Sequence, residues 1–340
     1  MSFKNKNMVL SLIAIMVVAV FAVGCGGGGD KKSAGKPIEI RWSYDMPANG
    51  TMSVVPETFK KLVDADPELK GKVTVRLYPA SQLYKPAEAL DAVARGDVEM
   101  ISLANWYLAA ISPKVTTFDL PFLFNDVQSM NKFLTSDIAK EIWQPLEAKG
   151  IVCVAAAATG PYSIISGSKE VILPTDAKGL KVRSLGDGSL TWLAVGASPV
   201  DLPAGDIFIA MQRGMIDAAD IGPISVKERN LFEVTKFYLD TFIHSTVITQ
   251  LSNKKFLDGM PADIRTKVMA HIKTAEKKHH DVVAEATKKD IAEIAQKGGK
   301  VHVLTAEEKK AWVDATASVR EKLGKSVGED FLKKVADTQK

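Results

Sequence analysis

Arg183 ends a short segment in which polar and apolar side chains alternate as they do in a strand. Within Gly179–Ser184, Leu180 and Val182 share one face, and Lys181 and Arg183 share the other. The carboxyl ends of strands are where open α/β sheets bind ligands, and a guanidinium group there can bind a carboxylate through two parallel N–H bonds. The pattern also suits a surface arginine, so spacing alone leaves both interpretations open.

The motifs of the common enzyme classes are missing. The sequence contains no Gly-x-Ser-x-Gly elbow, no phosphate-binding Gly-x-x-x-x-Gly-Lys loop and no His-x-x-x-His pair. Gly186–Gly188 lacks the rest of a dinucleotide-binding pattern, so we interpret it as a tight turn. The 44 basic and 40 acidic residues leave a formal charge of only +4, which argues against nucleic-acid binding. We therefore expect a binding protein with no cofactor and no metal, not an enzyme.

Strand-like and helical segments alternate along most of the chain, which predicts an α/β fold. The expected strands include 38–43, 72–77, 98–103, 151–157, 180–185, 216–220 and 246–251, and the expected helices include 52–65, 86–95, 189–195 and 205–213. The segment Pro261–Lys297 has helical spacing of apolar residues and no internal proline or glycine, which predicts one long helix. At 1.5 Å per residue, it would be roughly 55 Å long and would span two lobes.

The two halves of the chain share a weak internal repeat. Residues 88–99 and 206–217 each start with an acid, reach Ala-x-x-Arg-Gly, and continue into a strand whose second residue is an acid. An acid at the start of a helix and an arginine at its end both favour the helix dipole, so convergence explains part of the match. The shared order is nevertheless typical of two similar α/β lobes.

The N-terminus is predicted to be an export signal. Lys4 and Lys6 precede the apolar run Met8–Val23, which is shorter than the roughly 20 residues that a membrane span needs. Small residues lead to Cys25, and a glycine- and lysine-rich tether follows it, as in bacterial lipoprotein signals. We expect cleavage before Cys25 and lipidation of that residue; a simple secretory signal or an uncleaved anchor are the alternatives. Cys153 would then be a lone, buried thiol.

Several further segments, taken in order, resemble the DctP-like solute-binding proteins of tripartite ATP-independent periplasmic (TRAP) transporters. They are Arg76–Leu83, Ala94–Glu99, Asp119–Phe124, Gly179–Arg183, Gly196–Pro199 and Ala210–Asp217. The resemblance implies two lobes with a ligand cleft between them, braced by the long helix. It implies that Arg183 clamps the carboxylate of a small organic acid, which the protein passes to membrane permease subunits. A sensory protein that presents its closed form to a receptor is the alternative.

The resemblance also sets the expected organisation of the chain. The expected parts are a signal peptide (1–24), a tether (25–37), lobe I (38–160 with about 248–285) and lobe II (161–247 with about 286–340). The mature protein is expected to be periplasmic, tethered to a membrane through Cys25 and monomeric.

Two positions depart from the family's pattern. Many relatives carry a second arginine where this chain has Thr159–Ser163, and those that bind polyhydroxy sugar acids often have asparagine in place of Ile221. A pocket with one arginine, Tyr162 and Ile221 is therefore expected to suit a carboxylate smaller or more apolar than a sugar acid.

Asp220 matches an acid that helps to hold a cation in relatives that bind 2-oxo acids. Tyr162 and Ile221 occupy the partner positions, and one carboxylate is too few for a hard cation that takes about six oxygens. We expect Asp220 to accept a hydrogen bond from a ligand hydroxyl or amine instead. The remaining candidates for the pocket, for each of which a core or surface position is the alternative, are Tyr44, Asp45, Trp106 and Phe208.

Overall fold

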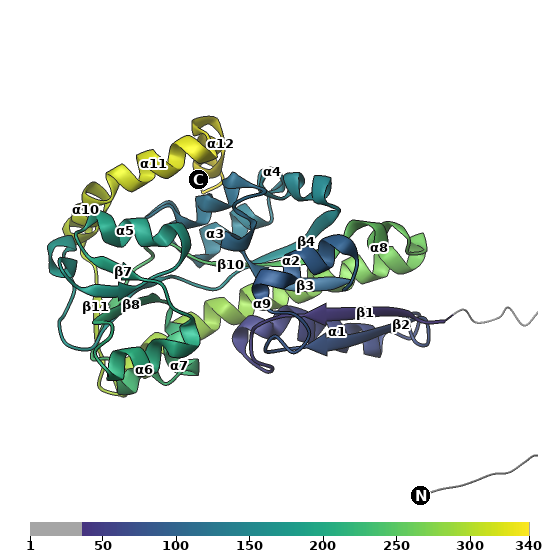
Figure 1. Cartoon of the computed structure of the whole chain (residues 1–340), viewed down its shortest axis with the longest axis horizontal. Helices are drawn as coiled ribbons and strands as arrows, with labels where there is room; N and C mark the ends of the chain where they lie inside the picture. Colours follow the sequence, from purple (N-terminus) through teal and green to yellow (C-terminus); the bar gives the residue numbers. More distant parts are fainter. Residues whose placement is uncertain (1–35, 340) are drawn as a thin grey trace, which may run out of the picture. The chain divides into compact units, whose positions relative to one another are not determined.

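A computed structural model describes residues 36–339, and these residues contain two β-sheets. The first sheet has the order β2-β1-β3-β10-β4, with β1 parallel to β2 and β3 and with β10 antiparallel to β3 and β4. Its strands are β1 (Ile38–Ser43), β2 (Val73–Tyr78), β3 (Met100–Ala104), β4 (Ile151–Ala158) and β10 (Val247–Asn253). The return of β10 to a sheet otherwise built from the N-terminal half ties the two halves together (Figure 1).

The second sheet has the order β11-β9-β5-β8-β6-β7. Its strands are β5 (Ser163–Ser166), β6 (Lys181–Arg183), β7 (Ser198–Val200), β8 (Ala218–Ile221), β9 (Phe237–Asp240) and β11 (Lys300–Val303). β6 is parallel to both β7 and β8, so the carboxyl ends of these three strands lie at the same edge. Arg183 is the last residue of β6; the sequence predicted a longer strand, 180–185, with Arg183 near its carboxyl end.

Helices pack on the sheets, and each sheet has a hydrophobic core on both faces. The helices are α1 (Val54–Ala65), α2 (Pro86–Arg95), α3 (Val127–Leu134), α4 (Lys140–Trp143), α5 (Ser189–Ala194), α6 (Ile207–Gln212), α7 (Pro223–Glu228), α8 (Lys254–Asp258), α9 (Ala262–Gln296), α10 (Ala306–Ala315), α11 (Ala317–Val327) and α12 (Glu329–Asp337). In β3, Met100 joins one core and Ile101 the other; in β8, Ala218 and Ala219 do the same. Strands covered on both faces need apolar residues at successive positions, which explains these apolar runs.

The internal repeat corresponds to the same structure in both halves. Gly96 follows α2 and Gly214 follows α6, both in the left-handed conformation (φ +84° and +64°) that favours glycine. The acid three residues after each glycine accepts a hydrogen bond from a backbone N–H of the neighbouring parallel strand. Glu99 accepts from the Arg41 N–H at 2.9 Å, and Asp217 accepts from the Lys181 N–H at 2.8 Å. The repeated acid therefore fixes one strand beside another in each half.

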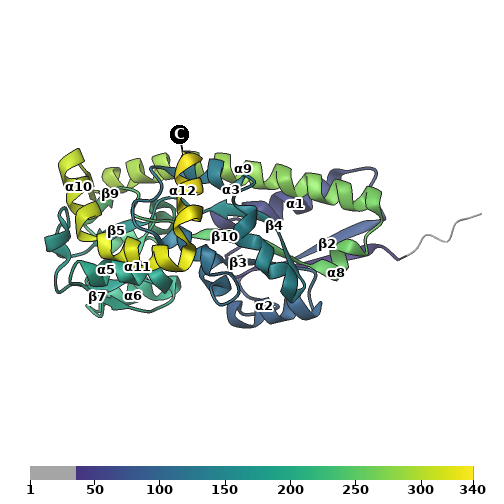
Figure 2. The same cartoon turned by 90° about the horizontal axis from the view of Figure 1, so that it is seen from above.

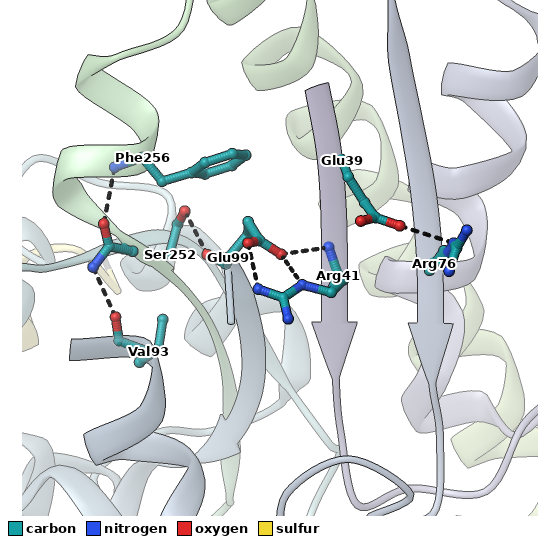
Figure 3. Close-up of polar contacts among 8 residues, drawn as sticks. Glu39, Arg41, Arg76, Val93, Glu99, Ser252 and Phe256 are labelled. Atoms are coloured by element: carbon teal, nitrogen blue, oxygen red, sulfur yellow. Dashed lines mark hydrogen bonds and ion pairs between the residues drawn. The ribbon is translucent and has the colours of Figure 1, made fainter. Parts of the chain in front are cut away.

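Glu99 also forms an ion pair with the Arg41 side chain. The Arg41 Nη2 lies 2.7 Å from one carboxylate oxygen, and its Nε lies 2.8 Å from the other, as Figure 3 shows. On the neighbouring pair of strands, Arg76 of β2 bridges to Glu39 of β1 at 2.8 Å. These ion pairs link β1 to the start of β3 on one side and to β2 on the other.

The long helix α9 packs against both sheets, as the sequence predicted (Figure 2). Val268 and Ile272 lie in a core of the first sheet, whereas Ile294 lies in a core of the second. The buried Glu276 of this helix also contacts the first sheet: its carboxylate accepts from the Ala156 N–H at 2.9 Å. One continuous helix therefore belongs to the packing of both sheets.

The C-terminal helices pass from the second sheet back to the first. Trp312 of α10 is buried in a core of the second sheet and donates its indole N–H to the Ile172 carbonyl at 2.7 Å. In α12, Phe331 and Val335 pack instead in a core of the first sheet. The sequence prediction placed all of 286–340 in lobe II, whereas these contacts place α12 against lobe I. The other predicted boundaries remain a prediction, and 1–35, with Cys25, lie outside the described residues.

Candidate functional site

Arg183 is buried at the carboxyl edge of the second sheet, with only 3% of its surface exposed. Its Nε donates to the Leu202 carbonyl at 3.0 Å, and its Nη1 donates to the Asp220 carbonyl at 3.2 Å. These two bonds use neutral carbonyls, and no carboxylate of residues 36–339 forms an ion pair with it. Its Nη2 has no hydrogen-bond partner within the same residues. A buried guanidinium with one fixed edge and one open end can bind an incoming carboxylate.

Burial lowers the pKa of Arg183, and the positive charge of Arg229 lowers it further. Tyr162, Asp220 and Asp201 act in the opposite direction. These neighbours define the electrostatic surroundings of the guanidinium. An anion bound beside Arg183 would relieve the cost of burying its charge.

The Asp220 side chain is held by three donors. Its Oδ2 accepts from the Ser184 hydroxyl at 2.9 Å, from the Trp192 indole N–H at 2.9 Å, and lies 2.8 Å from the His244 Nε2. The other oxygen, Oδ1, is buried and has no partner among the described residues. Because the Asp220 carbonyl also binds Arg183, this residue positions the guanidinium through its backbone while its carboxylate ties β8 to α5 and to the chain before β10.

His244 and Asp119 extend this buried cluster. Burial by itself lowers the pKa of His244, but the charge and hydrogen bond of Asp220, with the charge of Asp119, raise it overall. Burial raises the pKa of Asp119 to about 7, although His244 acts in the opposite direction. Sequence reasoning missed both residues. The usable signal was a histidine between the apolar pair Phe242–Ile243 and the buried strand Val247–Asn253.

Tyr162 and Trp106 lie near this cluster and come from different sheets. Tyr162 precedes β5 of the second sheet, and Trp106 follows β3 of the first. Tyr162 is bridged through its backbone to His244, and the two rings are 5.4 Å apart. Trp106 follows β3 and lies against η6 (Gly186–Gly188); a methyl group added at Gly186 would lie 3.4 Å from the Trp106 Cβ. The loop after β6 therefore contacts the segment that follows β3 of the first sheet.

The other candidates differ in exposure. Tyr44 is 2% exposed and packs in a core of the first sheet, where burial raises its pKa to about 12. Ile221 is 1% exposed in a core of the second sheet, and Phe208 is half-buried against that same core. Asp45 is exposed; desolvation by the surrounding protein raises its pKa, and the charge of Arg229 acts in the opposite direction. A role in ligand contact remains a prediction for each of them.

Residues 36–339 contain neither a metal-binding cluster nor a membrane-spanning helix. No group of three or more histidine, cysteine, aspartate or glutamate side chains there could hold a metal ion. No helix in this part of the chain is long and apolar enough to cross a membrane.

The chain resembles known proteins over most of its length. Residues 45–326 match the family model described as bacterial extracellular solute-binding protein, family 7, named DctP. The chain is 29% identical to the C4-dicarboxylate-binding periplasmic protein DctP of Rhodobacter capsulatus, over 87% of this chain and 90% of that protein. It is 27% identical to the 2,3-diketo-L-gulonate-binding periplasmic protein YiaO of Escherichia coli strain K12, over 88% of this chain and 92% of that one.

A solved structure agrees with this match. A TRAP periplasmic solute-binding protein from Shewanella oneidensis with bound succinate superposes with a TM-score of 0.82. Its sequence is 26% identical, and the match covers 89% of this chain and 100% of that one. The two-lobed α/β architecture expected from the sequence is thereby confirmed.

Proposed function

This chain belongs to family 7 of the bacterial extracellular solute-binding proteins, the DctP family, as its resemblance predicted, and we propose that it captures a small organic carboxylate and delivers it to a TRAP-type permease. The observation that carries this function is the buried Arg183, which no carboxylate of the described residues neutralises. The relative from Rhodobacter capsulatus is named for C4-dicarboxylates, and the Shewanella oneidensis protein holds succinate. The shared fold and the buried, unneutralised Arg183 support a small carboxylate as the ligand of this chain.

The expected ligand is a carboxylate smaller or more apolar than a sugar acid. Ile221 is buried where sugar-acid-binding relatives often have asparagine, so this position offers no hydrogen bond to a polyhydroxy chain. Titration calorimetry of the purified protein against short acids and against a uronate tests this point. Tight binding of the uronate without binding of any short acid would contradict it.

Substitution of Arg183 tests the function directly. Arg183→Ala should weaken binding by roughly 100-fold or more, because a charged hydrogen bond contributes about 1.5–3 kcal/mol and the bound carboxylate would also lose its counter-charge. Arg183→Lys should weaken binding as well, since lysine cannot form the two-pronged contact. Arg76→Ala removes an equal charge from an exposed ion pair and serves as the control. Unchanged affinity of the Arg183 variants would remove this residue from the site.

We also propose that the mature protein is a monomeric lipoprotein, anchored through Cys25 outside the inner membrane. The sequence around Cys25 supports this, and Cys153 offers no competing reactive thiol because burial raises its pKa. Cys25→Ala should abolish the mass added by lipid and release the protein from membrane fractions, whereas Cys153→Ala should do neither. A lipid adduct that persists in Cys25→Ala would contradict this anchor.

A further inference from the structure

A groove separate from the candidate site lies where the chain passes between the two sheets, and we call it the crossover groove. It has a volume of about 350 Å³, which suits a small molecule, and neither Arg183 nor Asp220 lines it. Pro161, between β4 and β5, and Thr241, between β9 and β10, form part of its wall. The start of α3 adds a wall from the first half, and the end of β11 adds one from the second. Both halves of the molecule therefore border this groove.

Asp240, which lines the crossover groove, lies at the same edge of the second sheet as Arg183. β6 is parallel to β8, and β5 is antiparallel to both β8 and β9, so β6 and β9 end at one edge. Arg183 is the last residue of β6 and Asp240 is the last residue of β9, with β5 and β8 between these strands. Three strand spacings therefore separate the two residues, which amounts to about 14 Å across the sheet.

Asp240 supplies the crossover groove with an acid that has no counter-charge. Its carboxylate forms no ion pair within residues 36–339. Burial raises its pKa, and no positive charge of the described residues acts in the opposite direction. A partly buried carboxylate without a partner is costly, and a bound ammonium group would offset that cost.

Thr287 of α9 supplies a second unused polar group. It lines the groove and is 9% exposed, and its hydroxyl oxygen is buried without a hydrogen-bond partner in the described part of the chain. A methyl group added at Gly160 would lie 3.1 Å from this oxygen, which places it beside the crossing from β4 to β5. A hydroxyl oxygen can accept a hydrogen bond from an ammonium group.

Two lysines bring the opposite charge to the same groove. Lys288 is exposed and Lys309 is half-buried near the start of α10, and neither forms an ion pair among residues 36–339. Asp126 also lines the groove, but its carboxylate caps α3 by accepting from the Ser129 N–H at 2.7 Å. A simple amine would be repelled by the lysines and a simple acid by Asp240, so a ligand that carries both charges fits best.

We propose that the crossover groove binds a small amino acid with an apolar side chain. Asp240 and Thr287 accept hydrogen bonds from its ammonium group, and Lys288 and Lys309 hold its carboxylate. The apolar side chain packs on Phe242, which also lines the groove. This site goes beyond the proposed function and does not depend on it.

Leucine and two analogues test this assignment. 4-Methylpentanoate lacks the ammonium group and 3-methylbutylamine lacks the carboxylate, while the branched chain stays the same. Titration calorimetry measures each compound against the wild-type protein and against Asp240→Asn. Asp240→Asn should weaken leucine binding by roughly tenfold or more, because it removes a charged hydrogen bond. It should not weaken binding of 4-methylpentanoate, since that acid has no group for Asp240 to hold.

Further variants test the other contacts. Thr287→Val keeps the shape of the side chain but removes its hydroxyl, so leucine should bind about threefold more weakly or worse. The double variant Lys288→Gln with Lys309→Gln should weaken leucine by about threefold or more, but not 3-methylbutylamine, which has no carboxylate. Asp281→Asn removes an acid from an exposed ion pair on α9 and should leave the affinity for leucine unchanged.

Arg183→Gln separates the crossover groove from the candidate ligand site. Leucine binding that is retained in Arg183→Gln and weakened in Asp240→Asn supports the assignment. The reverse pattern would place leucine beside Arg183 and overturn it. Equal affinity of the wild type and Asp240→Asn for leucine overturns it too, as does a wild-type protein that binds neither leucine nor phenylalanine.

Discussion

At the scale of single residues, the proposed site consists of Arg183 and the buried polar cluster beside it. The family resemblance proposed Arg183 for the ligand site, and the alternation of side chains placed it near the end of a strand. The cluster residues His244 and Asp119 were not predicted, because they meet Asp220 only through the fold: His244 lies 24 residues from Asp220, and Asp119 lies more than 100 residues from both. Nothing in the local pattern states that a histidine will meet Asp220, so only the fold reveals this pair.

Asp119 makes stability depend on pH. In the unfolded chain its carboxyl ionises at about 3.9, whereas in the folded protein burial raises its pKa to about 7. Between these values the unfolded state binds fewer protons, so this group makes the free energy of unfolding fall as pH rises from about 4 to about 7. The charged groups that act on Asp119 are His244, Asp187 and Asp220.

Asp119→Asn should remove this dependence. Because asparagine does not ionise, the variant should gain stability relative to the wild type as pH rises from about 4 to about 7, by roughly 2 kcal/mol or more. Urea unfolding at several pH values measures the difference, with Asp91→Asn on the exposed face of α2 as the control. Parallel pH profiles for Asp119→Asn and the wild type would show that this carboxyl is ionised in the folded protein.

At the scale of elements, the repeated acid explains why the two halves share a sequence pattern. Glu99 forms a backbone hydrogen bond and an ion pair, whereas Asp217 contacts a more exposed backbone N–H. Glu99→Ala should therefore cost about 1.5–3 kcal/mol and Asp217→Ala about 1 kcal/mol of stability. Urea unfolding compares them, and a larger loss for Asp217→Ala would contradict this explanation.

The longer elements were predictable and the shortest were not. The sequence predicted the ends of α2, α9, β4 and β10 to within about two residues. Each of these elements has regularly spaced apolar residues or a residue that marks its end. Strands β5, β7, β9 and β11 were missed. β7 spans Ser198–Val200 and contains Pro199, and β11 is partly exposed at a sheet edge, so neither shows enough alternation to be recognised.

At the scale of the whole molecule, two lobes and a long bracing helix were expected from the resemblance, and the fold confirms them. The return of α12 to the first sheet was not foreseen, because its apolar face suits either lobe equally. Contacts between the halves include the Glu228–Thr51 hydrogen bond and the approach of Trp106 to Gly186. These contacts join the segment after β1 to the end of α7, and the segment after β3 to the loop after β6.

The course of α9 also constrains how such proteins can diversify. Because one uninterrupted helix supplies buried side chains to both sheets, neither lobe has a boundary at which it could be exchanged as a cassette. A recombinant that joins lobes from two relatives would have to match one parent's helix to the other parent's core. New ligand preferences are therefore more readily reached by point changes near Arg183 than by shuffling of domains.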